Sequence, residues 1–162
     1  MKTLNYHDKF KLIFATIHLF QKRCPKTKGK KRNMAQVKIY GLRKNLHKIQ
    51  DKLSETIHNF IVQSLSFPKD KKYHRFIKFD DNDMISPDDK SYKYTIIEII
   101  MMEGRTTETK KKLIKSLFEN IETNLDISPH DIEICIIETP PSNWGFRGMT
   151  GDEIKLNYQV KV

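Results

Sequence analysis

Apolar and polar residues follow two different periods along the chain, and these periods predict its elements. Val37 and Ile39 alternate with polar neighbours, which indicates a half-buried strand that ends at Gly41. Apolar residues then recur at helical spacing with charged residues between them, and they are Leu46, Ile49, Leu53, Ile57, Phe60 and Ile61. They predict an amphipathic helix of about twenty residues. Residues 73–79, YHRFIKF, predict a second strand, which precedes a polar loop over residues 80–91.

The same order of elements repeats in the second half of the chain. Residues 94–102, YTIIEIIMM, predict a strand that is apolar on nearly both faces and ends at Gly104. Thr106 or Thr107 can cap the helix that follows. The apolar stripe of that helix consists of Leu113, Ile114, Leu117, Phe118, Ile121 and Leu125. Residues 132–138, IEICIIE, then predict the next strand.

The two halves superpose when residue 95 is written over residue 35. The apolar pairs that coincide at this offset are Leu53 with Leu113, Ile57 with Leu117, Ile61 with Ile121 and Leu65 with Leu125. We therefore predict a two-layer α+β fold, in which duplicated β-α-β units form a four-stranded sheet with two helices on one face. The strand at 94–102 is apolar on both faces, so we expect further copies of the chain to cover the open face. The segment 154–162 alternates cleanly and predicts a terminal strand.

Positive charge is concentrated at the start of the chain. Residues 1–33 hold ten Lys and Arg against the single acid Asp8, a balance of +9, whereas residues 34–162 hold twenty basic and nineteen acidic residues, a balance of +1. We interpret residues 1–33 as a basic flexible leader or as sequence upstream of a start at Met34. The nearly neutral remainder, 34–162, is expected to be one domain with units at about 34–92 and 93–162. Nucleic-acid binding is therefore expected only through the leader.

Several other classes of protein are disfavoured by the composition. Cys24 and Cys135 have no CxxC spacing, which favours a reducing, cytoplasmic compartment over a disulfide framework. The six histidines are scattered, so we expect no metal site. The apolar run at residues 10–20 is too short to span a bilayer, and no small-residue cleavage site follows it.

A glycine-rich segment near the end of the chain is the strongest local motif. Residues 143–148, NWGFRG, hold the only tryptophan between Asn143 and a glycine, and Arg147 between Phe146 and a second glycine. Such spacing suits a backbone that bends tightly and approaches another group closely. A hairpin with a partly buried Trp144 and a loop that contacts an anion through Arg147 both fit this pattern.

The second unit resembles the tautomerase superfamily, whose members include oxalocrotonate tautomerase and proteins of the macrophage migration inhibitory factor type. The resemblance rests on EGR at 103–105, the capped helix after it, SPHD at 128–131 with its alternating strand, and the WG hairpin. It extends over about residues 34–162 and is strongest to long, fused bacterial tautomerase-like proteins. It implies a cofactor-independent homotrimer with an amino-terminal proline as its catalytic base.

In this family the proline amine moves a proton between an enol oxygen and a carbon next to a carbonyl, while arginines hold the substrate carboxylate. The resemblance implies that Arg105 is this anchor and that residue 35 is the base. The other residues implied to bind substrate are Asn143, Trp144, Phe146, Arg147 and His74. The family's acidic residue before the second strand falls on Lys71, one place from Asp70.

The chain departs from the family at the base, since Ala35 replaces the proline. If translation begins at Met34 and the methionine is removed, Ala35 carries a free α-amine, whose reference pKa is about 7.7 to 8.0. We therefore expect keto-enol tautomerisation of a small α-keto or enol carboxylate. The alternative is a catalytically inactive trimer that binds such a carboxylate. From spacing alone, Arg105 also fits a surface charge at a strand end, and His74 a half-exposed structural residue.

Overall fold

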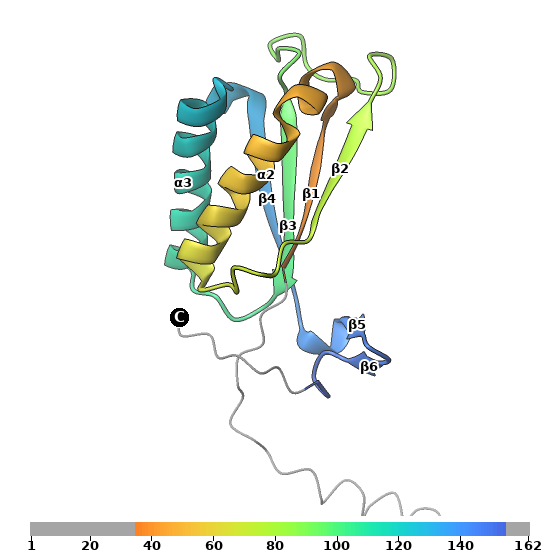
Figure 1. Ribbon diagram of the computed structural model, residues 1–162, viewed down its shortest axis with the longest axis vertical. Coiled ribbons are helices and arrows are strands. Elements are labelled where there is room, and N and C mark those ends of the chain that lie inside the picture. The colour runs from red at the N-terminus through yellow and green to blue at the C-terminus, as the bar shows by residue number, and fades with distance from the viewer. Residues whose placement is uncertain (1–34, 155–162) are drawn as a thin grey trace, which may run out of the picture. The chain divides into compact units, whose positions relative to one another are not determined.

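The computed structural model describes residues 35–154 (Figure 1). The leader expected over residues 1–33 lies outside the described residues, and so does the predicted terminal strand apart from Ile154. Among the described residues, no helix is long and apolar enough to cross a membrane.

The first unit consists of strand β1, Ala35–Leu42, helix α2, Arg43–Leu65, and strand β2, His74–Phe79. Buried and half-buried residues alternate along β1, as expected for a strand with one face against the core. Helix α2 follows β1 directly and has neither a capping side chain nor an acid in its first turn. It ends at Ser66, whose φ of 50° lies in the left-handed region that commonly terminates helices.

The second unit consists of β3, Thr95–Met102, helix α3, Thr107–Leu125, and β4, Ile132–Thr139, with a short 3₁₀ turn, η1, at Pro129–Asp131. Gly104 has a φ of 122°, so it turns the chain sharply after β3. Thr106 then caps α3 by accepting a hydrogen bond from the backbone nitrogen of Thr109 at 3.2 Å. The predicted cap at 106 or 107 is therefore resolved in favour of Thr106.

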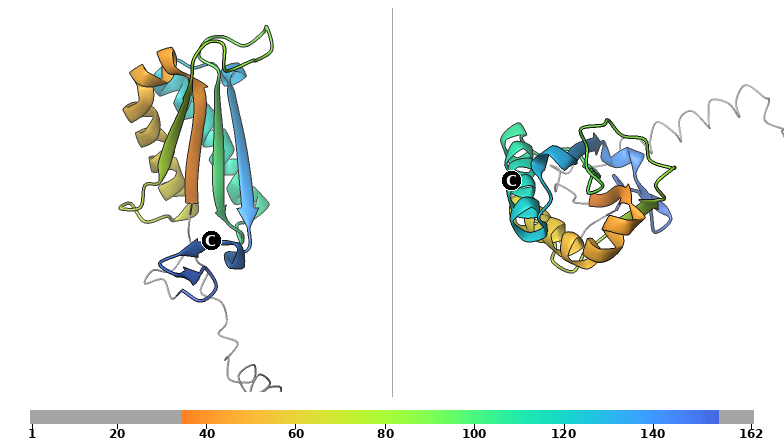
Figure 2. Two further views of the ribbon diagram at one scale, coloured as in Figure 1. Left: turned by 90° about the vertical axis from the view of Figure 1, so that its right-hand side faces the viewer. Right: turned by 90° about the horizontal axis from the view of Figure 1, so that it is seen from above.

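The four strands form one sheet in the order β2-β1-β3-β4. The strands within each unit are parallel, whereas β1 and β3 are antiparallel to each other. Both helices cover the same face of the sheet (Figure 2), and no helix of residues 35–154 covers the opposite face, which is called the open face below. The predicted two-layer α+β fold is thus confirmed. A short 3₁₀ turn, η2, at Pro141–Asn143 follows β4. The chain then forms a second sheet, a two-stranded hairpin of β5, Gly145–Phe146, and β6, Met149–Thr150.

The duplication read from the sequence is confirmed at the level of strand register. Val37 pairs with His74 in the first unit, and the residues 60 positions later, Ile97 and Ile134, pair in the second. Both helices also end in the same way, because Asp126 has a φ of 54°, close to that of Ser66. The apolar stripes meet in one core, whose fully buried members from the helices include Leu53, Ile57, Ile61, Leu113, Leu117 and Ile121.

The open face of the sheet mixes apolar and charged side chains. Tyr40 donates a hydrogen bond to Glu98 at 2.8 Å, and Lys38 lies 3.6 Å from the same carboxylate. Burial is the main reason that the pKa of Tyr40 is raised, and the Glu98 carboxylate adds to it. Ile137 remains 37% exposed on β4. The open face therefore carries exposed apolar side chains beside paired charged groups.

Candidate active site

The topology of the sheet brings several separate segments to one end. Because β1 and β3 are antiparallel, the start of β1 lies beside the end of β3, and Ala35 pairs with Met101. The segment that enters β2 reaches the same end, since the backbone nitrogen of Val37 donates to the Tyr73 carbonyl at 2.9 Å. The β5–β6 hairpin follows the end of β4 there (Figure 1). The family resemblance implied that residue 35, Arg105 and the segment 143–148 share one site, whereas the periodicity of the sequence did not join these segments.

Arg105 is buried at this end and is only 7% exposed. Its Nη1 atom donates to the Met102 carbonyl at 3.3 Å, which ties the guanidinium to the last residue of β3. The interpretation of Arg105 as an ordinary surface charge is therefore wrong. A guanidinium stays charged in proteins, so burial strengthens its attraction for an anion that reaches it.

Ala35 is 5% exposed and opens β1. Within the 162-residue chain its nitrogen belongs to an amide, which cannot take up a proton at neutral pH. Only a chain that begins at residue 35 provides an amine at this position. The base and the anchor implied by the resemblance are therefore at the same end of the sheet, although their roles stay predictions.

The glycine-rich segment forms the predicted hairpin. Arg147 has a φ of 56° and Gly148 a φ of 73°, so the two turn residues are both left-handed, as in a type I′ turn. The backbone nitrogen of Gly151 donates to the Trp144 carbonyl at 2.7 Å and closes the hairpin. A Cβ atom at Gly151 would lie 2.5 Å from the Pro141 carbonyl oxygen and 2.8 Å from the Met102 side chain. The hairpin is therefore packed tightly against the end of β3 that also holds Arg105.

The side chains of the hairpin differ in exposure. Asn143 and Arg147 are exposed, whereas Trp144 and Phe146 are half-buried. The Trp144 Nε1 atom is buried, and no described residue accepts its hydrogen bond. A buried donor without an acceptor costs stability, so it is available to a ligand acceptor at little additional cost.

His74 lies at the start of β2, on the face of the sheet that packs against α2. Its Nδ1 atom is 2.9 Å from the Ser54 hydroxyl of that helix. Burial lowers the pKa of His74 to about 4, and the neighbouring charges of His58 and Lys72 act in the same direction. His74 is thus a neutral residue at neutral pH, and its predicted contact with substrate stays a prediction.

The segment between α2 and β2 carries Asp70 and Lys71, whose charged groups are 3.1 Å apart. The hydrogen bond from Lys71 is the main reason that the pKa of Asp70 is lowered. Glu138 was not among the residues expected at the site. It lies one residue before the end of β4, opposite Met101, and accepts a hydrogen bond from Lys110 at 2.6 Å. The Oε1 atom of Glu138 is buried with no hydrogen-bond partner among the described residues. Only its position at the end of a predicted strand could have drawn attention to it.

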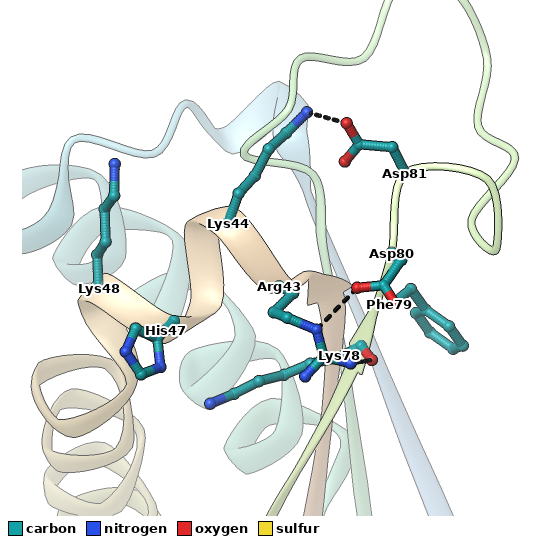
Figure 3. A pocket seen from close by; sticks show the side chains of 8 residues that line it. All are labelled: Arg43, Lys44, His47, Lys48, Lys78, Phe79, Asp80 and Asp81. Atoms are coloured by element: carbon teal, nitrogen blue, oxygen red, sulfur yellow. Dashed lines mark hydrogen bonds and ion pairs between the residues drawn. The ribbon is translucent and has the colours of Figure 1, made fainter.

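A hollow of about 820 Å³ lies at the opposite end of β1, where α2 begins (Figure 3). The residues that line it are Arg43, Lys44, His47, Lys48, Lys78, Phe79, Asp80 and Asp81. Two of the cations are paired, since Arg43 lies 2.7 Å from Asp80 and Lys44 lies 2.9 Å from Asp81. This hollow contains no residue of the predicted site, and its ion pairs are exposed. Among the described residues, no group of His, Cys, Asp and Glu has an arrangement suited to a metal ion.

Comparisons with known proteins agree with this geometry. The model of the Tautomerase enzyme family matches residues 71–147. "Probable tautomerase YrdN" of Bacillus subtilis is 25% identical over 99 residues, which are 59% of this chain and 77% of that protein. "Probable tautomerase RSp0893" of Ralstonia nicotianae is 33% identical over 54 residues, which are 33% of this chain and 77% of that protein.

A solved structure, a fused 4-OT wild-type asymmetric trimer, superposes with a TM-score of 0.64 at 19% identity. The match covers 72% of this chain and 96% of that one, so it extends over both units of the sheet. The sequence matches identify the family, and the structural match shows the fold. The chain therefore belongs to the tautomerase superfamily.

Proposed function

We propose that this protein catalyses keto-enol tautomerisation of a small α-keto or enol carboxylate, in a form whose residue 35 carries a free amine. One observation supports this most strongly: the start of β1 and the buried Arg105 lie at the same end of the sheet, through the pairing of Ala35 with Met101. Membership of the tautomerase superfamily supports the class of reaction.

The amine of residue 35 takes a proton from the carbon next to the carbonyl and delivers it to the oxygen that becomes the enol hydroxyl. Ketonisation moves the proton in the opposite direction. Negative charge grows on the dienolate during this transfer, so a fixed cation close to it lowers the barrier. Arg105 binds the substrate carboxylate through its planar fork of N–H donors, which matches the geometry of a carboxylate. Trp144 and Phe146 form an apolar wall, and Asn143, Arg147 and His74 are further candidates for contact with substrate.

The proposed active form is a homotrimer in the cytoplasm, and residues 34–162 form its domain. Two observations support the trimer. The open sheet face carries apolar side chains such as the 37% exposed Ile137, and the related fused 4-OT is a trimer. The basic segment 1–33 is proposed to be a leader or upstream sequence that the active form lacks.

A second candidate function is a trimer that binds a small carboxylate without turnover. The observation that favours it is Ala35 itself, because alanine stands where the family has its proline and is 5% exposed. In this case Arg105 keeps its role as an anion anchor, and the proton-transfer base is missing.

The experiment compares ketonisation of an aryl enolpyruvate by four proteins: the full chain, the chain begun at Met34, that shorter chain with Ala35→Pro, and the last of these with Arg105→Ala. We expect turnover from the shorter chain and more from its Ala35→Pro variant. Arg43→Ala is the matched control, because Arg43 is an exposed arginine at the opposite end of β1. The binding function would instead be supported by two results together. No protein would show a rate above buffer, and calorimetry would detect binding of the arylpyruvate that Arg105→Ala abolishes.

A further inference from the structure

Three polar residues occupy core-facing positions of the first unit where the second unit is apolar. They are Ser54 and His58 on α2 and His74 on β2. The residues 60 positions later are Ile114, Phe118 and Ile134, of which Phe118 and Ile134 pack against the hydrophobic core. The register of the strands is the same in both units at these positions. The second unit therefore serves as an internal reference for an apolar version of the same layer.

Each of the three side chains has a defined partner. His58 is 7% exposed, and its Nε2 atom lies 2.8 Å from the Lys69 carbonyl. Because a carbonyl oxygen only accepts, Nε2 carries the proton and donates. Ser54 and His74 are joined at 2.9 Å, and the two imidazole rings meet edge to face with centroids 6.0 Å apart. The cluster thus links α2, β2 and the segment 66–73 that connects them.

The segment 66–73 lies against the start of β1. It contains a turn in which the Lys71 nitrogen donates to the Pro68 carbonyl at 3.1 Å, and it ends where Tyr73 accepts from Val37. The parallel register of Val37 with His74, continued backwards, brings Lys72 opposite Ala35. His58 therefore holds the middle of a segment whose end borders the nitrogen of residue 35.

The corresponding connection of the second unit is held in another way. Ser91 donates to Asp131 through its backbone nitrogen at 2.8 Å, and Lys93 lies 2.8 Å from Asp126. Lys90 also donates to the His130 carbonyl inside the connection at 2.7 Å. All three of these residues precede β3 in the chain, so the second connection is held from the loop before β3 and not from its helix. Phe118 occupies the position of His58 in this unit. A helix histidine is therefore not a general requirement for this kind of connection.

We propose that Ser54, His58 and His74 act together as a latch that positions the segment 66–73 beside residue 35. His58 is a positioning residue in this scheme, because it acts through the Lys69 carbonyl and touches neither substrate nor base. The latch also sets the position of the ion pair between Asp70 and Lys71, the two residues that directly precede Lys72. Its catalytic meaning rests on the proposed function, since it matters to the reaction only if residue 35 is the base.

Trypsin tests the latch on the full-length protein, because Lys69, Lys71 and Lys72 lie within the segment. Cleavage after these residues is followed by mass spectrometry, with melting temperature recorded in parallel. His58→Phe introduces the residue of the second unit, so we expect the fold to persist and cleavage to accelerate at least tenfold. His58→Gln keeps an N–H donor and should stay within about threefold of the wild type. Phe118→Leu is the matched control, since it disturbs the other helix.

Equal cleavage of His58→Phe and wild type, with His58→Gln also unchanged, would overturn the latch. Acceleration in Phe118→Leu as large as in His58→Phe would also overturn it, because the effect would then reflect general loosening of the core. The cleavage measurement requires no turnover, so the latch and the proposed function fail separately. In protein that ketonises the enol substrate, His58→Phe should lower kcat at least tenfold and change KM less than threefold, and His58→Gln should restore most of kcat.

Discussion

The neutral state of His74 makes the fold sensitive to mild acid. Burial, with the neighbouring charges of His58 and Lys72, lowers the pKa of His74 from 6.5 to about 4. The unfolded chain therefore binds this proton more readily than the folded one. The contribution to stability is complete above about pH 6.5 and is lost as the pH falls from 6.5 towards 4.

The size of this loss follows from the same shift. A difference of about 2.5 pKa units corresponds to about 3 kcal/mol, and partial exposure of the ring reduces the expected value to about 2 kcal/mol. Carboxylates with lowered pKa values, such as Asp126 and Asp131, lose most of their contributions below their ordinary value of 3.8, so the effect of His74 dominates at higher pH.

Urea unfolding between pH 7.5 and pH 4.2 measures the effect, and His74→Ile is its matched control. Isoleucine is the residue at the equivalent position, Ile134, of the second unit. The free energy of unfolding should fall by about 2 kcal/mol more in the wild type than in His74→Ile over this range. Parallel pH profiles for the two proteins would refute the assignment of this acid sensitivity to His74.

Three further substitutions test the packing, each by urea unfolding. Gly151→Ala should destabilise by about 1 to 3 kcal/mol, since its Cβ would lie 2.5 Å from the Pro141 carbonyl oxygen; an unchanged midpoint would contradict the hairpin packing. Leu117→Ala, at a fully buried position, should cost about 2 to 5 kcal/mol. A loss below 1 kcal/mol would contradict its place in the core. Thr106→Ala should cost about 1 kcal/mol through its lost helix cap, and Thr107→Ala, its control, much less.

Most of the fold could be predicted from the periodicity of apolar residues in the sequence. The stripes at Leu53 and Leu113 gave the helices and their common offset, and the strand registers repeat at that same offset. This works because one buried face per element is a local, periodic property that residue order records directly. The hairpin could also be predicted, since Gly145 and Gly148 on either side of Phe146 and Arg147 indicate a tight turn.

The arrangement of the site was much less accessible from the sequence. The burial of Arg105 is a property of the folded chain that its spacing in the sequence does not record. The packing of Gly151 against Met102 and Pro141 likewise joins the β5–β6 hairpin to the end of β3, which is distant from it in sequence. In the sequence His58 is one of several scattered histidines, because nothing in the neighbouring residues distinguishes a buried imidazole from an exposed one. Its hydrogen bond to the Lys69 carbonyl could therefore not be predicted. Contacts between distant segments leave no periodic signal, so spacing alone could not reveal them.

The central claim is that an amine at residue 35 and the guanidinium of Arg105 act on one substrate. Ketonisation of an aryl enolpyruvate by the Met34-started Ala35→Pro protein tests it most directly, with Arg105→Ala in the same background as the comparison. We expect a rate well above buffer and a loss of kcat/KM of about 100-fold on removing the guanidinium, which corresponds to about 3 kcal/mol. A rate equal to buffer, or one that Arg105→Ala leaves unchanged, would contradict the claim.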